Sequence, residues 1–339
     1  MTEPDLLLSV VIPCYNYEAF VGEAIESVLD QMTPDMEVIV VDDGSTDGSW
    51  NVIRRYGDRA NCIRTENRGQ LQAYFTGYAE ARGRFIYFLD ADDVLCPGAM
   101  EILRPHLRPE VSKIQFMLKP IDRAGVGIGE PFPKLDPRAD SSALIELIAR
   151  RGSYVTPPTS GNVYRRDVYD EVGDLSYESS IDGAPYLFAP FLGEVVTIDR
   201  PLGLYRIHGS NISAFSSMSA ERIDHCIERF QDRLQHLKAL LAEKKIGRGF
   251  ELKPHYAYVG ELRLMRSVAR GRRPSANLLF PYLKSLMTEQ SGAPRLFYAG
   301  FALLLFALPV SLATKIMDFR VNPAAFRGMR TRVKALMAS

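Results

Sequence analysis

The first hundred residues alternate between short apolar runs and amphipathic stretches, and this order constrains the fold more than any other feature of the chain. Apolar or β-branched segments of strand length occur at residues 6–13, 37–41, 62–65 and 85–89. Stretches with apolar residues at helical spacing follow them, at residues 18–31, 49–56, 71–81 and 97–107. Continuous apolar runs are typical of strands that are buried on both faces of a sheet. The order therefore predicts an α/β fold with a doubly wound, mostly parallel sheet.

The pattern changes twice further along the chain. Residues 113–213 are mixed, and we expect strands at 114–118, 162–165, 195–198 and 203–207 and helices at 142–151 and 184–192. The chain is helical afterwards, with helices expected at 220–245, 256–269 and 277–288. We therefore expect boundaries near residues 110 and 215, with the first two regions forming one α/β domain and the third a helical extension.

Near the C-terminus, residues 296–314 contain no charged side chain. Their length approaches the roughly 20 residues that cross a bilayer, but Gly300 and Pro309 interrupt the run. A basic tail follows, with Lys315, Arg320, Arg327, Arg330, Arg332 and Lys334 against one acid, Asp318. This asymmetry predicts membrane contact through residues 296–339, by a spanning or an in-plane helix. The alternative is a buried helix that packs on its neighbours.

Composition limits the partners and the compartment. The chain has 339 residues with 41 Lys and Arg and 41 Asp and Glu, and zero net charge argues against nucleic acid as the main partner. The four cysteines form no CxxC pair, which favours reduced thiols. The N-terminus lacks a basic region, so residues 6–13 are expected to be a strand and not a signal peptide. We expect a cytoplasmic protein at the inner face of the cell membrane; the oligomeric state stays open.

Two groups of carboxylates follow predicted strands. Asp42 and Asp43 come at the end of the second strand, and Gly44 next to them allows a sharp turn. Asp43 is able to accept hydrogen bonds from a nucleobase N–H and a ribose hydroxyl. One residue of the segment 45–47 is expected to cap the next helix, but capping does not explain two adjacent carboxylates.

The second group, Asp90, Asp92 and Asp93, follows the fourth strand. Three carboxylates this close repel one another unless a cation joins them. Mg²⁺ or Mn²⁺ takes oxygen ligands and shares them with substrate phosphates. The alternative is a helix cap before Pro97, which uses one aspartate and not three. Ligands of doubly wound sheets bind at the carboxyl ends of the strands, where both groups fall.

Four motifs in order and spacing resemble the pattern of the family 2 glycosyltransferases. They are Val10-Val11-Ile12-Pro13-Cys14-Tyr15-Asn16, Val41-Asp42-Asp43-Gly44-Ser45-Thr46-Asp47, Glu66-Asn67-Arg68-Gly69 and Phe88-Leu89-Asp90-Ala91-Asp92-Asp93. The resemblance implies a GT-A-like, Rossmann-like fold, inversion at the anomeric carbon and a nucleotide-diphosphate sugar donor, most often a UDP-sugar. Residues 1–110 would then bind the nucleotide sugar and residues 111–215 the acceptor.

The resemblance also assigns roles to residues. Nucleotide contacts are implied for Pro13, Tyr15, Asp42 and Asp43; Arg68 is placed near the donor phosphates, Asp90 on the ribose or sugar side, and Asp92 on the metal with support from Asp93. Tyr15 as an ordinary core aromatic is the alternative. The segment 205–213 resembles the family's closing segment, which makes His208 a candidate metal or diphosphate contact; a plain loop histidine is the alternative.

The family commonly shows a Glu-Asp pair at the start of a helix in the acceptor half. This chain has Ile181-Asp182, so the glutamate is missing. Asp182 matches the second position and is the candidate general base, with a helix N-cap as an equally simple reading. The single tryptophan, Trp50, leaves no Gln-x-x-Arg-Trp motif, which favours transfer of a single sugar over polymer synthesis.

The sequence therefore predicts a metal-dependent inverting glycosyltransferase with Mn²⁺ or Mg²⁺ as cofactor. The expected acceptor is a hydroxyl of a glycan or a lipid-linked molecule, as in cell-envelope polysaccharide synthesis. The main alternative is a catalytically inactive, membrane-associated scaffold that binds nucleotide sugars. A nucleotidyltransferase is a further alternative, although the first loop lacks the Gly-rich, basic character of such enzymes.

Overall fold

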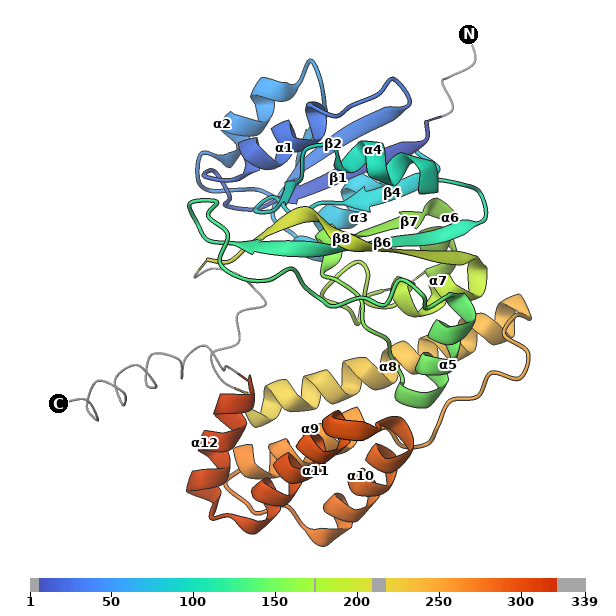
Figure 1. The fold of residues 1–339 in the computed structure, drawn as a ribbon. Coiled ribbons are helices and arrows are strands. Elements are labelled where there is room, and N and C mark those ends of the chain that lie inside the picture. Colours follow the sequence, from blue (N-terminus) through green and yellow to red (C-terminus); the bar gives the residue numbers. More distant parts are fainter. Residues whose placement is uncertain (1–5, 174, 209–217, 322–339) are drawn as a thin grey trace, which may run out of the picture. The chain divides into compact units, whose positions relative to one another are not determined.

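A computed structural model describes residues 6–173, 175–208 and 218–321. Contacts divide the chain into two compact units, and most of the first consists of residues 1–146 and 153–208. The described part of this unit contains an eight-stranded sheet (Figure 1). Its strands are β1 (Leu8–Cys14), β2 (Met36–Asp42), β3 (Asn61–Arg64), β4 (Phe85–Phe88), β5 (Val94–Leu95), β6 (Val111–Ile121), β7 (Asn162–Arg165) and β8 (Glu194–Arg206).

The sheet has the order β3-β2-β1-β4-β7-β6-β8-β5 and is mixed. Strands β1 to β4 are parallel to one another, as the alternation of strands and helices predicts. Strand β7 runs antiparallel to both β4 and β6, and β5 runs antiparallel to β8. The prediction of a mostly parallel sheet is therefore right for the first half and wrong for the second, where only β6 and β8 pair in parallel.

The helices of the described chain begin and end within about four residues of their predicted positions, except one at 166–172 that the sequence does not predict and two that divide the uncharged run 296–314. They are α1 (Val21–Leu29), α2 (Ser49–Ile53), α3 (Gln70–Glu80), α4 (Ala99–Leu103), α5 (Ser141–Arg151), α6 (Arg166–Val172), α7 (Pro185–Leu192), α8 (Ala220–Lys244), α9 (Ala257–Ala269), α10 (Ala276–Glu289), α11 (Gly292–Ala307) and α12 (Val310–Val321). Short 3₁₀ turns follow α2 and α4 at Arg54–Tyr56 and Arg104–His106, and a third lies at Thr159–Gly161.

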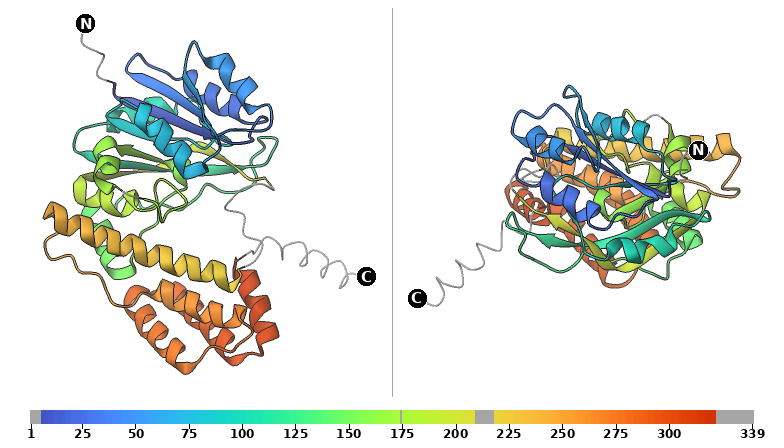
Figure 2. Two further views of the ribbon diagram at one scale, coloured as in Figure 1. Left: turned by 180° about the vertical axis from the view of Figure 1, so that it is seen from behind. Right: turned by 90° about the horizontal axis from the view of Figure 1, so that it is seen from above.

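Successive residues of β1 point to opposite faces, and helices cover both faces. Val10 and Ile12 belong to a core that includes apolar residues of α1 and α4. Val11 faces α3 instead, where a Cβ on Gly77 would lie 2.3 Å from a methyl group of Val11. Glycine at this position therefore lets α3 pack closely on the sheet (Figure 2).

Strand β8 is one continuous element, although the sequence predicts two strands at 195–198 and 203–207. Asp199-Arg200-Pro201 interrupts the apolar pattern there. Strand β8 itself takes up the interruption by bulging, because the consecutive β6 residues Phe116, Met117 and Leu118 pair with Ile198, Pro201 and Gly203. Long-range pairing with β6 thus overrides the local break that proline causes. Helix α6 and strand β5 are short elements that the sequence pattern does not predict.

The second unit contains residues 147–152, 209–235 and 249–339. Its described part is helical, and α9 to α12 pack on one another. The uncharged run 296–314 is not one helix, because α11 ends at Ala307 and α12 begins at Val310. Leu308 is extended, with φ −80° and ψ 157°, as expected for a residue before proline. Over the described residues, no helix is long and apolar enough to cross a membrane.

Helix α11 is apolar on two opposite faces. Phe301, Ala302 and Leu305 are buried against the unit. The opposite face carries four large side chains that are 46% to 74% exposed: Leu296, Phe297, Leu303 and Leu304. The predicted basic tail lies mostly in residues 322–339, which fall outside the described part of the chain.

Candidate active site

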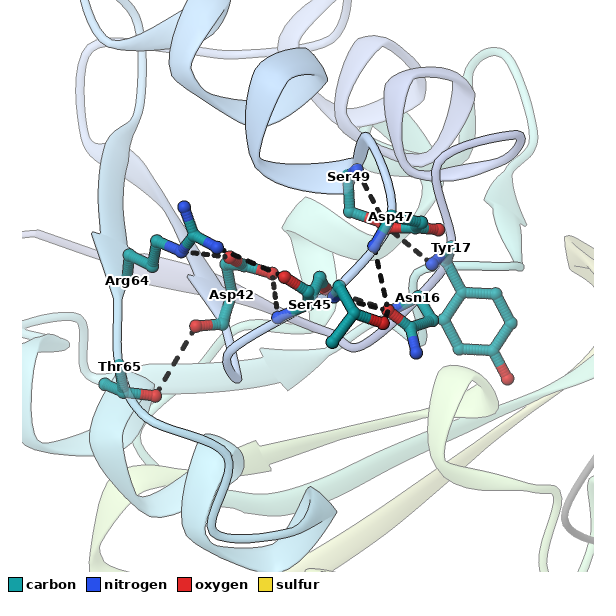
Figure 3. A network of polar contacts seen from close by, with 9 residues as sticks. Asn16, Tyr17, Asp42, Ser45, Asp47, Ser49, Arg64 and Thr65 are labelled. Atoms are coloured by element: carbon teal, nitrogen blue, oxygen red, sulfur yellow. Dashed lines mark hydrogen bonds and ion pairs between the residues drawn. The ribbon is translucent and has the colours of Figure 1, made fainter.

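The loops that follow β1 and β2 are joined by a network of hydrogen bonds (Figure 3). The Asn16 side-chain oxygen accepts the backbone N–H of Thr46 at 2.8 Å, and the Asn16 N–H donates to Ser45 Oγ at 2.9 Å. The Tyr17 N–H donates to Ser49 Oγ at 2.9 Å. Asn16 has a left-handed backbone with φ 59°, which asparagine tolerates better than most residues. The two loops therefore form one ordered wall at the carboxyl ends of β1 and β2.

Asp42 is fully buried and holds this wall to β3. Its Oδ1 accepts the Ser45 N–H at 3.2 Å, and its Oδ2 lies 3.1 Å from Arg64 Nε. Its backbone oxygen also accepts the Thr65 N–H at 2.9 Å. The Asp42 carboxylate therefore has partners within the protein, and its contacts stabilise the loop after β2.

Asp43 lies next to the loop that precedes α3. Its two carboxylate oxygens accept the backbone N–H groups of Arg68 and Gly69, each at 2.9 Å. Gly44 has φ +68°, and a Cβ there would lie 2.6 Å from the Asn67 nitrogen. Asp43 and Gly44 thus allow the loop after β2 and the loop before α3 to approach closely. The sequence alone does not reveal this reason for an aspartate followed by a glycine.

The predicted nucleotide contacts Pro13, Tyr15 and Arg68 lie at this same edge of the sheet. Pro13 is buried in β1, whereas the side chain of Tyr15 is 43% exposed just after the strand, which argues against a core role for Tyr15. Arg68 is exposed. Their positions are compatible with ligand contact, and their roles stay predictions.

Asp90 follows β4 and is half-buried. Its carboxylate accepts a hydrogen bond from the Tyr74 hydroxyl, and its N–H donates to Ser160 Oγ at 3.1 Å. Burial raises the pKa of Asp90 to about 7, and the negative charges of Asp92 and Asp182 raise it further against the Tyr74 bond. Asp182 is therefore close enough to Asp90 for their charges to interact.

Asp92 and Asp93 are held by one buried arginine, Arg206, at the end of β8. The Arg206 N–H donates to Asp93 Oδ1 at 2.9 Å, and its Nε donates to the Asp92 carbonyl oxygen at 2.9 Å. The guanidinium also pairs with Glu23 of α1. Burial, followed by the charge of Asp92, raises the pKa of Asp93 well above its usual range. The second oxygen of Asp93 is buried without a hydrogen-bond partner.

His208 lies beside Asp92, with Nε2 at 2.9 Å from Asp92 Oδ2. Its ring stacks on Phe20 at 5.2 Å between centroids and meets the edge of Tyr17 at 5.8 Å. Two predicted metal contacts far apart in the sequence are therefore neighbours in space, and His208 is buried here and not a plain exposed loop residue.

Asp182 lies in the turn before α7. Its Oδ1 accepts from Ser180 Oγ at 2.6 Å, and its Oδ2 lies 3.4 Å from Asn162 Nδ2. The N-cap position of α7 is Ala184, so Asp182 does not cap this helix with its side chain. The carboxylate is partly exposed, as a group that contacts an acceptor needs to be.

The carboxylate cluster has an electrostatic character that suits a divalent cation. Asp92 and Asp93 are buried and Asp90 is half-buried, and burial, followed by the negative charge of Asp92, raises the pKa values of Asp90 and Asp93. In the described part of the chain, no three His, Cys, Asp or Glu side chains already stand in a metal-binding arrangement. The donor oxygens fit Mg²⁺ or Mn²⁺ in chemical type.

Sequence reasoning missed three residues of this region. Tyr74 in α3 holds Asp90, Arg206 holds both following aspartates, and Lys113 is a fully buried lysine in β6. Arg206 stands within the segment 205–208 that the sequence singles out, so a signal for it exists. Tyr74 and Lys113 carry no local signal, because their partners are distant in sequence.

A mixed sheet with carboxylates gathered at the carboxyl ends of its strands defines the GT-A class of nucleotide-sugar enzymes. Solved structures of this class share the fold. TarS 1–349 of S. aureus in complex with UDP aligns with a TM-score of 0.55 and 16% identity over 93% of this chain and 91% of that one. A mannosyltransferase of Pyrobaculum calidifontis in complex with GDP-Man and Mn²⁺ aligns with a TM-score of 0.51 and 18% identity over 95% and 87%.

Sequence comparison identifies the family. The family described as Glycosyl transferase family 2 matches residues 9–119. An uncharacterized glycosyltransferase of Nostoc sp. is 36% identical over 228 residues, which are 63% of this chain and 69% of that protein. Chondroitin synthase of Escherichia coli is 32% identical over 146 residues, but the match spans only 21% of its length. The chain belongs to the family 2 glycosyltransferases and is an enzyme.

Proposed function

We propose that the enzyme transfers a single sugar, with inversion, from a nucleoside-diphosphate sugar to a hydroxyl group. The observation that supports this most directly is the convergence of Asp43, Asp90, Asp92 and Asp182 on one edge of the sheet. The structural neighbours were solved with UDP, UDP-GlcNAc or GDP-Man, so UDP-sugars and GDP-sugars are the donor classes to test. A UDP-sugar is our first choice.

Asp92 is the proposed main ligand of a divalent cation, with Asp90 and His208 beside it. The Pyrobaculum neighbour was solved with Mn²⁺, which makes Mn²⁺ or Mg²⁺ the candidate cofactor. A bound cation would act as a Lewis acid that neutralises the negative charge of the departing diphosphate. Tyr74 holds the Asp90 carboxylate, and Arg206 holds the backbone of Asp92 through its carbonyl oxygen.

Asp182 is the proposed general base, which takes the proton from the acceptor hydroxyl as its oxygen attacks. Ser180, Thr159 and Asn162 surround its carboxylate and restrict its orientation. Ile181 is buried in place of the family's glutamate and contributes apolar packing to the turn. The charge of Asp182 contributes to the raised pKa of Asp90, which supports a base close to the proposed donor site.

The acceptor that we propose is lipid-linked or attached to the cell envelope. Helix α11 carries an exposed apolar stripe that consists of Leu296, Phe297, Leu303 and Leu304. Other apolar side chains of α11 already pack against the rest of the second unit. A stripe of this kind is typical of a helix that lies in the plane of a membrane surface. We place the enzyme at the cytoplasmic face of the membrane on this basis.

Calorimetric titration tests the donor site. UDP, GDP, UDP-GlcNAc and GDP-mannose are titrated into the wild type and Asp92→Asn, with Mn²⁺ or with EDTA. We expect one nucleotide class to bind with Mn²⁺ and to lose at least about tenfold in affinity in the variant, as for a lost charged contact. Asp58→Asn, a change of an exposed aspartate, is the matched control and keeps wild-type affinity.

The alternative of an inactive scaffold makes a different prediction. A scaffold binds the nucleotide but releases no diphosphate from any sugar donor. The absence of binding by every nucleotide, with and without Mn²⁺, would contradict the donor site itself.

A further inference from the structure

Lys113 of β6 is a fully buried lysine whose ammonium group contacts oxygen atoms only. Its Nζ lies 2.9 Å from Gln115 Oε1, 3.2 Å from Tyr154 Oη and 2.7 Å from Thr156 Oγ1. None of these three partners is a carboxylate. A buried cation with neutral neighbours is costly, so its surroundings must favour the charged form in another way.

The directions of the surrounding hydrogen bonds show which form of Lys113 they favour. The Tyr154 hydroxyl donates its proton to the Tyr186 carbonyl oxygen at 2.6 Å. The Thr156 hydroxyl donates to Asn162 Oδ1 at 3.1 Å. Both hydroxyl groups therefore present only lone pairs to Lys113 Nζ.

Gln115 provides the third hydrogen-bond acceptor for Lys113 Nζ. Its amide nitrogen donates to Thr197 Oγ1 at 2.9 Å, which turns its carbonyl oxygen toward Lys113. Three acceptors thus surround Nζ, and only an ammonium group has three N–H bonds to offer. The faces of three aromatic rings add cation–π attraction, at 5.0, 5.5 and 5.9 Å for Tyr154, Tyr164 and Tyr186.

A chain of hydrogen bonds leads from this ammonium to Asp182. Lys113 donates to Thr156, and Thr156 donates to the oxygen of Asn162. The Asn162 amide nitrogen donates to the Pro157 and Pro158 carbonyl oxygens at 3.1 and 3.0 Å and also lies 3.4 Å from Asp182 Oδ2. Every donor in the chain points from the cation toward the carboxylate. Burial lowers the pKa of Lys113 to about 7, and the charge of Asp182 opposes that change.

We propose that Lys113 is a positioning residue for the transfer step, because it orients Asn162 through Thr156 and so helps to direct the Asp182 carboxylate at the acceptor. This inference rests on the proposed role of Asp182 as the base. A well-packed apolar residue would serve the fold at least as well as a buried charge without a direct counter-ion. A role at the site around Asp182, which the chain of hydrogen bonds reaches, therefore explains why the chain has a buried lysine here despite its cost in folding free energy.

Four variants test the proposal. Lys113→Met removes the charge but keeps the length of the side chain, and Thr156→Val removes the hydroxyl link but keeps the shape. Thr156→Ser restores the link. Lys119→Met, at an exposed lysine of the same strand, is the matched control. The measured quantity is release of nucleoside diphosphate from UDP-GlcNAc and GDP-mannose with Mn²⁺ and with water as acceptor.

We expect kcat to fall about 10- to 100-fold in Lys113→Met and Thr156→Val, which is part of what a general base contributes. The KM for the donor should stay within about twofold, because the nucleotide site is untouched. Thr156→Ser and Lys119→Met should behave like the wild type. Wild-type kcat in folded Lys113→Met, or in folded Thr156→Val if the first variant does not fold, overturns the proposal.

Asp182→Asn separates this proposal from the proposed function. If Lys113 acts through Asp182, adding Lys113→Met to Asp182→Asn lowers kcat no further, whereas independent effects multiply. Full activity of Asp182→Asn overturns the role of the base and with it that of Lys113. A kcat that is lowered in Asp182→Asn and falls further in the double variant overturns the role of Lys113 alone. A wild type that releases no diphosphate from either donor contradicts the proposed function and this role together.

Discussion

At the scale of single residues, the carboxylates of the site differ in what holds them. Asp42 and Asp43 are bound by backbone N–H groups and an arginine, so their charges are compensated within the protein. Asp90 and Asp93 have raised pKa values, chiefly because burial, followed by the charge of Asp92, disfavours their ionised forms. The first pair thus builds the walls of the site, while the second group is suited to a cation. A motif of adjacent aspartates does not separate these roles.

Asp43→Ala is expected to lower the free energy of unfolding by about 1–3 kcal/mol, because it leaves the Arg68 and Gly69 amides without their acceptor. Nucleotide affinity should fall as well, since the loop that carries Arg68 is released. Urea denaturation and calorimetry measure the two effects. The exposed control Asp58→Ala should change stability by less than about 0.5 kcal/mol. A stable Asp43→Ala would show that other contacts hold the loop.

Acid stability should depend on the pair of Asp35 and Arg104. Two hydrogen bonds of 2.9 and 2.7 Å join them, and chiefly these bonds lower the pKa of Asp35 from 3.8 to about 2. A carboxyl group whose pKa is lower in the folded state stabilises the fold above the unfolded value. This contribution is lost as the pH falls from about 4 to about 2.

Asp35→Asn lacks this contribution. The difference in unfolding free energy between wild type and variant should therefore be constant above about pH 5 and vanish near pH 2. Urea denaturation at several pH values measures it, with Asp58→Asn as the exposed control. A difference that does not change with pH would mean that the pair contributes through shape and not through charge.

At the scale of elements, α11 differs from an ordinary surface helix. A helix that packs with one face normally shows polar residues on the other. The outer face of α11 instead carries Leu296, Phe297, Leu303 and Leu304. Because Leu308 precedes Pro309 and is extended, α11 ends there, and the apolar run does not form one long continuous helix. The length of an uncharged run is therefore a poor predictor of a membrane-spanning helix when a proline divides the run.

The double variant Leu296→Ser/Phe297→Ser is expected to reduce sedimentation with anionic vesicles by more than half. The two changes remove much of the apolar area that would enter the interface and leave the buried face unaltered. Ile128→Ser, also about half exposed but in a loop of the first unit, is the control. Unchanged vesicle binding by the double variant would exclude this face as the contact.

At the scale of the whole molecule, the chain is organised as two units with separate cores, and the proposed donor site belongs wholly to the first. A ligand that binds only the native first unit protects the amides of that unit. The second unit, with α9 to α12, offers the apolar surface and none of the carboxylates of the proposed donor site.

Hydrogen exchange with UDP and Mn²⁺ should show this division. We expect slower exchange in the loops after β1, β2, β3 and β4 and no change in α9 to α12. EDTA should remove the protection, as should Asp92→Asn. Equal protection of both units would contradict this prediction, because it would mean that nucleotide binding slows hydrogen exchange in the second unit as well.

The sequence by itself determined the strands and helices of the first hundred residues and the loops that carry the chemistry. Strands β1 to β4 and helix α3 lie within two residues of their predicted bounds, because buried parallel strands are encoded by local apolar runs. Glycine and aspartate at the strand ends are equally local signals. The family follows from the same segments.

Only the tertiary structure decided how distant residues meet. The mixed second half of the sheet, the continuity of β8 and the contact of His208 with Asp92 all depend on pairing across long stretches of chain. The same holds for Arg206 on Asp93 and for the path from Lys113 to Asp182. The sequence marks the segment that contains Arg206 but not its partner, and it marks neither end of the path from Lys113, because the packing of the whole sheet brings these partners together.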